Sequence, residues 1–160
     1  MYKKLKDDPE ALEKLKILSD FDLHSIEQPI RQGQFEEMAR LCEVTPLPIA
    51  LDEELIPACS DPGSLLNMIN PQYIILKPSL LGGFDSSQRW ISAAESIGAD
   101  YWITSALESN VGLNAIAQWT YTLTSPLAQG LGTGGLFTNN IQGTLEVERG
   151  KLWNRPDKNW

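Results

Sequence analysis

The chain has 160 residues, about the size of one domain, and 42% of them are hydrophobic, which is enough to form a buried core. Its net charge of −8 and its lack of a basic cluster argue against a nucleic-acid partner and against anionic membranes, because both require Lys and Arg to neutralise phosphates. No apolar run approaches the roughly 20 residues of a membrane span, and the charged N-terminus lacks the apolar core of a signal peptide. We therefore expect one cytoplasmic domain over residues 1–160.

The first predicted element is a helix that begins near Asp8. Residues 1–7 carry no clear pattern and are either native or foreign sequence. Asp8 is a favourable helix cap, Pro9 suits the first helical position, and Glu10 suits the positive end of the helix dipole. Leucines then recur at helical spacing, which predicts a helix after this start.

After this helix the chain repeats a unit made of a short apolar run, a turn and a helical stretch. The apolar runs cover residues 24–27, 49–52, 73–77, 101–104 and 127–130. The expected intervening helices cover residues 35–41, 62–68, 86–96 and 112–121. Alternating strands and helices imply an α/β fold with a parallel sheet covered by helices. A loop over residues 130–143 and a small β-hairpin over residues 144–153 are expected at the end.

About five parallel βα-type units do not close an eight-stranded barrel, which needs about 250 residues. The chain therefore forms either an open doubly wound sheet or part of a (β/α) barrel, and its charged residues decide between these two folds.

Glu27, Asp52 and Lys77 each end an apolar run and are spaced 25 residues apart, in register with the repeat. A charge at the end of a buried strand is costly unless it is paired or bound to a metal. The C-terminal strand ends form the active-site face of (β/α) barrels, and two carboxylates there can share a hard cation such as Mg²⁺. The alternative is a ladder of salt bridges along the strand ends.

The chemically versatile residues outside this trio are expected to be structural. Cys42 and Cys59 have no metal-like spacing, so one buried thiol at each position is the simplest expectation in a reducing cytoplasm. His24 is the only histidine and lies three residues before Glu27, so strand alternation places it on the other face of the sheet.

Three segments resemble the enolase superfamily, and within it the muconate-lactonising-enzyme-like branch. They are residues 25–29 (SIEQP), 48–53 (PIALDE) and 75–83 (ILKPSLLGG). Residues 104–112 (TSALESNVG) and 130–137 (GLGTGGLF) most resemble the o-succinylbenzoate synthases of that branch. The resemblance covers about residues 10 to 155, and it implies the C-terminal portion of a (β/α) barrel, strands four to eight, with a C-terminal extension.

In that family Glu27 and Asp52 would be two of three ligands of a Mg²⁺ ion, and Lys77 would be one of two catalytic lysines. The reaction is a dehydration that forms o-succinylbenzoate for menaquinone synthesis. The metal would hold the substrate carboxylate, and Lys77 would stabilise the intermediate as a cation. Ser105, Glu108 and Ser109 would help to bind a substrate carboxylate or the succinyl tail.

The sequence departs from the family pattern because the first metal aspartate and the lysine pair of the second barrel strand have no counterpart in it. We therefore expect Mg²⁺ to bind weakly or not at all, and the chain alone to be inactive. Unpaired strand edges would favour self-association.

Two other functions stay open. A racemase, epimerase or cycloisomerase of the same superfamily would use Lys77 as an acid or base. A non-catalytic folding or assembly unit would retain Glu27 and Asp52 without using them. A Rossmann-like binding protein is disfavoured because no Gly-x-Gly-x-x-Gly follows a first strand.

Overall fold

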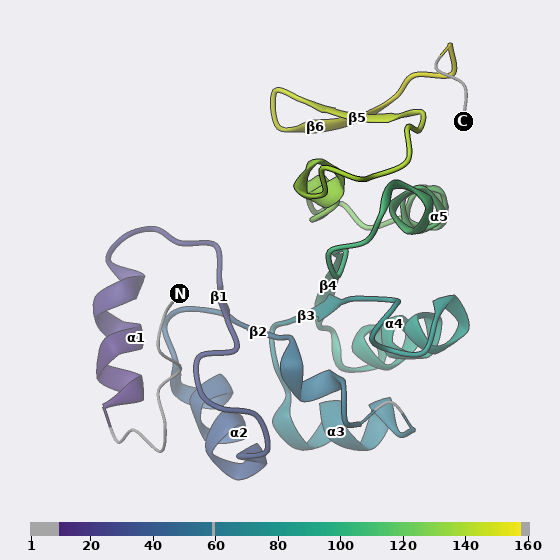
Figure 1. Ribbon diagram of the computed structural model, residues 1–160. Coiled ribbons are helices and arrows are strands. Elements are labelled where there is room, and N and C mark those ends of the chain that lie inside the picture. The colour runs from purple at the N-terminus through teal and green to yellow at the C-terminus, as the bar shows by residue number, and fades with distance from the viewer. Residues whose placement is uncertain (1–9, 59, 158–160) are drawn as a thin grey trace. The chain divides into compact units, whose positions relative to one another are not determined.

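The computed structural model describes residues 10–58 and 60–157, and the chain divides into two compact units (Figure 1). The first unit comprises Met1–Ile75 and Gln88–Tyr101, and the second comprises Leu76–Ser87 and Trp102–Trp160. The predictions for residues 1–7, Asp8, Pro9 and Cys59 lie outside the described residues. Every described helix falls short of the length and apolar character that a bilayer crossing requires.

The first unit alternates helices and parallel strands, as the repeat in the sequence predicts. Its elements are α1 (Ala11–Ser19), β1 (Ile26–Glu27), α2 (Phe35–Val44), β2 (Ile49–Leu51), the 3₁₀ helix η1 (Glu53–Leu55), α3 (Pro62–Ile69), most of β3 (Tyr73–Leu76), most of α4 (Phe84–Ile97) and the start of β4 (Asp100–Ile103). The strand order is β1-β2-β3-β4, and Figure 1 shows α2 and α3 side by side beneath the first strands.

The core of this unit is centred on β2. Ile49, Ala50 and Leu51 are all 0% exposed, so both faces of the strand are covered, as is usual in parallel sheets. Helix α3 has strong local signals for its ends. Asp61 caps its first turn by accepting a hydrogen bond from the Ser64 N–H at 3.1 Å.

The N-terminal edge of this sheet is held by a glutamine amide. Oε1 of Gln72 accepts a hydrogen bond from the Ile49 N–H at 3.0 Å, and its Nε2 donates to the carbonyl of Cys42 at 3.0 Å. Cys42 is a buried free thiol, which confirms its prediction. Burial raises the pKa of Cys42 to about 12. At the same edge the ring of His24 lies 4.7 Å from the ring of Tyr73, an aromatic contact that supports a structural role.

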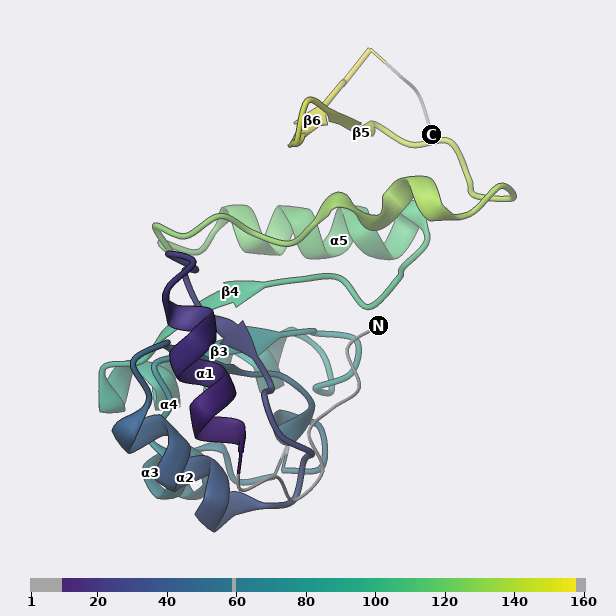
Figure 2. The same ribbon diagram turned by 90° about the vertical axis from the view of Figure 1, so that its left-hand side faces the viewer.

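The second unit contains the end of β4, α5 (Asn110–Tyr121), the 3₁₀ helix η2 (Gly132–Leu136) and the antiparallel hairpin of β5 (Leu145–Glu148) and β6 (Lys151–Asn154). Figure 2 shows the chain after α5 running back along this helix towards η2. Arg149 and Gly150 both adopt positive φ, at 51° and 74°, as a two-residue hairpin turn requires. The predicted hairpin is therefore confirmed.

The expected fifth strand at residues 127–130 does not form within the described residues. Only a single parallel bridge joins Thr104 to Gly130. One cause is Gln129, whose side-chain oxygen accepts the Ile103 N–H at 2.7 Å and takes the place of a main-chain acceptor. Gly130 permits the one bridge that forms, because a Cβ atom there would lie 2.7 Å from Oγ1 of Thr104. A side chain thus performs part of the pairing that the backbone performs in the other strands.

Candidate active site

The C-terminal ends of β1 and β2 lie at one edge of the sheet, because the two strands are parallel and in register. Glu27 is the last residue of β1 and pairs with Ala50, and Asp52 directly follows β2. Side chains alternate along a strand, so Asp52 is placed on the side to which Ala50 and Glu27 point. Two carboxylates therefore end strands that are about 4.8 Å apart.

Glu27 and Asp52 are the two carboxylates that the sequence predicts as magnesium ligands. Asp52 is 3% exposed and Glu27 is exposed, so one carboxylate lies in the interior and the other at the surface. Mg²⁺ prefers oxygen ligands in an octahedral arrangement and usually retains several waters. Within residues 10–58 and 60–157, no group of three or more His, Cys, Asp or Glu side chains could hold a metal ion. Glu27 and Asp52 supply oxygen ligands of the type that Mg²⁺ prefers, and as a pair they could fill at most part of its coordination shell.

Two residues beside this pair of carboxylates were missed by the sequence analysis. Gln28 and Glu54 are 4% and 2% exposed, and Nε2 of Gln28 donates to Oε2 of Glu54 at 2.8 Å. The other carboxylate oxygen of Glu54 accepts the Gly33 N–H at 2.7 Å. The only signal in the sequence was their position, one residue after Glu27 and two residues after Asp52.

Lys77 directly follows β3, and its side chain is half-buried. Its carbonyl oxygen accepts hydrogen bonds from the N–H groups of Leu80 and Leu81, at 2.8 and 3.1 Å. Gly82 and Gly83 then adopt φ values of 89° and 97°, which glycine reaches without strain. This tight turn fixes the backbone from which the Lys77 side chain projects.

Ser105, Glu108 and Ser109 lie in the loop between β4 and α5. Ser105 is buried, and its N–H donates to the Gly130 carbonyl at 3.3 Å. Both carboxylate oxygens of Glu108 are buried, and neither has a hydrogen-bond partner within the described residues. Gly112 makes room for this side chain, because a Cβ atom there would lie 2.9 Å from Cγ of Glu108. The loop therefore has an unsatisfied acceptor at Glu108.

The backbone of this loop is strained next to Glu108. Leu107 adopts φ 63°, an uncommon conformation for a bulky residue, and its side chain is exposed. Ser109 occupies the cap position of α5, but its side chain makes no capping hydrogen bond. Strained backbone of this kind clusters at functional sites, which agrees with the expected role of the loop.

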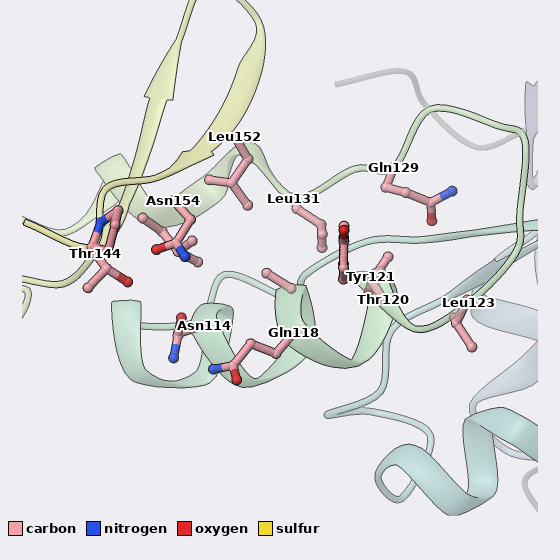
Figure 3. Close-up of a pocket in the computed structure, with 13 residues that line it drawn as sticks. Asn114, Gln118, Thr120, Tyr121, Leu123, Gln129, Leu131, Thr144, Leu152 and Asn154 are labelled. Atoms are coloured by element: carbon pink, nitrogen blue, oxygen red, sulfur yellow. The ribbon is translucent and has the colours of Figure 1, made fainter.

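A separate pocket of about 980 Å³ lies in the second unit, between α5 and the hairpin (Figure 3). Figure 3 shows Leu131 and Leu152 on one side of it and Gln118 and Thr120 of α5 on the other. None of the six residues predicted for the active site is among its described lining residues. This pocket is therefore not the site that the sequence indicates.

Comparison with known proteins shows to which family the chain belongs. The family described as enolase C-terminal domain-like matches residues 4–157. The chain belongs to this family. An o-succinylbenzoate synthase from Desulfotalea psychrophila is 59% identical to the chain over 143 residues, which are 89% of the chain and 39% of that enzyme. The chain thus spans less than half the length of this enolase-type relative.

Two solved structures have a fold similar to that of this chain. The crystal structure of MenC from Desulfotalea psychrophila superposes with a TM-score of 0.86 at 58% identity, over 89% of this chain and 40% of that one. A variant of muconate cycloisomerase superposes with a TM-score of 0.80 at 28% identity, over 89% and 40% of the two chains. The predicted α/β fold, the C-terminal portion of an enolase-type barrel, is confirmed.

A relative with a different name is also similar. An N-succinylamino acid racemase from Thermus thermophilus is 34% identical over 101 residues, which are 63% of this chain and 27% of that enzyme. The enolase-type fold of the chain is therefore shared by enzymes with at least two named activities.

Proposed function

We propose that the chain contributes two metal ligands and one lysine to the active site of an o-succinylbenzoate synthase, a dehydratase of the enolase superfamily. The observation that carries this proposal is the pair of carboxylates, Glu27 and Asp52, at the ends of neighbouring parallel strands. The 59% identity to a relative with that name supports the choice of reaction.

In this proposal Glu27 and Asp52 would hold Mg²⁺. The ion would supply positive charge at the substrate carboxylate, which stabilises the negative charge that develops when a lysine of the second barrel strand, outside this chain, takes the α-proton. Lys77 would lie beside the substrate ring and stabilise the same charge through its ammonium group. The net change is loss of water from a hydroxylated cyclohexadiene carboxylate, and the ring becomes aromatic.

The loop between β4 and α5 would bind the rest of the substrate. The hydroxyls of Ser105 and Ser109, and the N-terminus of the 12-residue helix α5, suit a negatively charged carboxylate. Glu108 cannot share that role, because its own carboxylate would repel the ligand. Its buried oxygens instead suit a hydrogen-bond donor, such as a hydroxyl group of the substrate.

The test is a chimaera in which this chain replaces the 143 matched residues of the Desulfotalea psychrophila synthase. We expect the chimaera to dehydrate the cyclohexadiene substrate, and the change Lys77→Ala within it to abolish most of the activity. The product is aromatic, so its formation can be followed by ultraviolet absorbance. Conversion of N-acylamino acids alone would contradict the synthase proposal.

The second candidate is a racemase, which the 34% identity to the Thermus thermophilus enzyme supports. In a racemase Lys77 would itself give or take the α-proton, and no hydroxide would leave. Proton exchange between the substrate α-carbon and heavy water separates the two reactions, because a racemase exchanges this proton without loss of water. The same chimaera serves both assays.

A third possibility is a folding or assembly unit without catalysis. In the sheet order β1 is an outer strand, and an outer strand with unpaired backbone groups can pair with another chain. Light scattering across a range of protein concentrations would measure such self-association. A concentration-independent monomer that binds Mn²⁺ would contradict this alternative.

A further inference from the structure

The side-chain amide of Gln28 joins the C-terminal ends of β1 and β2 through four hydrogen bonds. Oε1 accepts the N–H groups of Asp52 at 3.2 Å and of Glu54 at 3.3 Å. Nε2 donates to Oε2 of Glu54 at 2.8 Å and to the carbonyl of Ile30 at 3.2 Å. An amide has two acceptor positions and two donor hydrogens, so every one of them is used here.

With a glutamate at position 54, a glutamine at position 28 supplies both the acceptor and the donors that the site uses. A glutamate at position 28 would lose both donors and would place a second carboxylate against Glu54. An alanine would leave the Asp52 and Glu54 N–H groups without this partner in a buried region. Position 28 therefore requires hydrogen-bonding groups, which an apolar side chain could not supply.

The amide acts on the backbone from which both proposed metal ligands project. Gln28 adopts φ 40°, a conformation that side-chain-bearing residues rarely adopt, immediately after Glu27. Asp52 adopts φ −126° and ψ −83°, outside the regular helix and strand regions, and its N–H is held by the Gln28 amide. Such conformations persist only where the surroundings hold them, and the amide is a contact that both residues share.

We infer that Gln28 is a positioning residue that sets the separation and direction of the Glu27 and Asp52 carboxylates, with Glu54 as its anchor. The inference rests on the proposed function, because it concerns the two ligands assigned there. Partners of this kind orient metal ligands, and their loss typically weakens metal affinity about 10- to 100-fold.

The test uses the chimaera described above, because the rest of the synthase supplies the metal ligand that has no counterpart in this chain. Its Mn²⁺ affinity is measured from the paramagnetic broadening of backbone amide signals near Ala50. We expect Gln28→Glu to weaken this affinity about tenfold. The double variant Gln28→Glu with Glu54→Gln exchanges the amide and the carboxylate. It restores the hydrogen bond between the two side chains and retains the acceptors for the Asp52 and Gly33 N–H groups. We expect it to recover most of the lost affinity.

Gln72→Glu is the matched control, because it changes an amide that bridges the other edge of the same sheet. We expect its Mn²⁺ affinity to stay within twofold of that of the chimaera without substitutions. Equal losses in Gln28→Glu and Gln72→Glu, or no recovery in the double variant, would overturn the positioning role. If Gln28→Glu fails to fold, the folded double variant carries the test, and a tenfold loss of affinity there would also overturn it.

Failure of the proposed function gives a different result. If the chimaera without substitutions shows no site-specific broadening by Mn²⁺, the metal site itself is wrong, and the positioning role falls with it. If this chimaera binds Mn²⁺ and its Gln28→Glu variant binds equally well, only the positioning role is wrong.

Discussion

The two ends of β2 are held by the same type of side chain but in different electrostatic surroundings. At the N-terminal end, the Gln72 amide joins two neutral backbone groups, those of Ile49 and Cys42. At the C-terminal end, the Gln28 amide joins backbone groups and also the carboxylate of Glu54. Glu27 and Asp52 stand next to this second amide, and no carboxylate takes part in the bridge at the first.

The comparison shows that joining these strands does not require charge. One neutral amide is sufficient at the N-terminal edge, where the adjacent Cys42 is buried. Buried carboxylates are costly, so their concentration at the C-terminal edge needs another explanation than strand pairing. Ligand binding is such an explanation, and it weakens the alternative of a purely structural ladder of charges.

The largest expected effect comes from Asp52→Asn. The substitution keeps the shape of the side chain but removes one of the two proposed metal ligands. Mn²⁺ affinity, measured by amide broadening, should fall by more than the roughly 10- to 100-fold that loss of an outer partner causes. Thermal unfolding of the same variant checks that the fold is intact. Retained affinity would show that the C-terminal edge is as structural as the N-terminal one.

Lys77→Ala should have the next largest effect, on catalysis in the chimaera. Removal of a group that stabilises charge or transfers a proton typically lowers kcat by about 10²- to 10⁴-fold. Arg40→Ala is the control, since Arg40 pairs with Glu37 on the surface of α2. Measurement of kcat and KM for both variants distinguishes the two roles. An increase in KM with kcat unchanged would make Lys77 a binding residue.

Removal of each bridging amide should affect stability to different extents. Gln28→Ala removes this partner from a buried carboxylate oxygen, a backbone carbonyl and two backbone N–H groups, and we expect a loss of about 4 kcal/mol. Gln72→Ala leaves one N–H and one carbonyl, and we expect a loss of about 2 kcal/mol. Urea unfolding of both variants gives the two values. Equal losses in the free energy of unfolding would show that the two amides stabilise the fold to the same extent.

The strands and the two carboxylates could be predicted because their signals are local and periodic. The repeat of about 25 residues placed β1 to β4, and the charge at the end of each run marked Glu27 and Asp52. The hairpin was predicted at residues 144–153, around Arg149 and Gly150. In the structure these two residues adopt the positive φ that such a turn requires.

The bridges made by glutamine side chains could not be predicted in this way. Gln28 and Glu54 are 26 residues apart, and their contact depends on a positive φ at a residue that is not glycine. At residues 127–130, a glutamine side chain again makes a contact that the pattern did not predict. Gln129 takes the place of a main-chain acceptor, and no regular strand forms there. An amide follows no hydrophobic period, so pattern analysis assigns it no partner.

The smallest expected effect concerns the thiol of Cys42 at the N-terminal edge. Burial raises its pKa to about 12, whereas an unfolded cysteine titrates near about 8.5. The neutral thiol therefore stabilises the fold below about pH 8.5, and this contribution decreases as the pH rises towards about 12. In the Cys59→Ser variant, Cys42 is the only thiol. At pH 8 it should react with a disulfide reagent at least about a thousandfold more slowly in the folded chain than in denaturant, because little thiolate is present. Rapid reaction of the folded variant would mean that the N-terminal edge is open, and it would remove the contrast with the C-terminal edge.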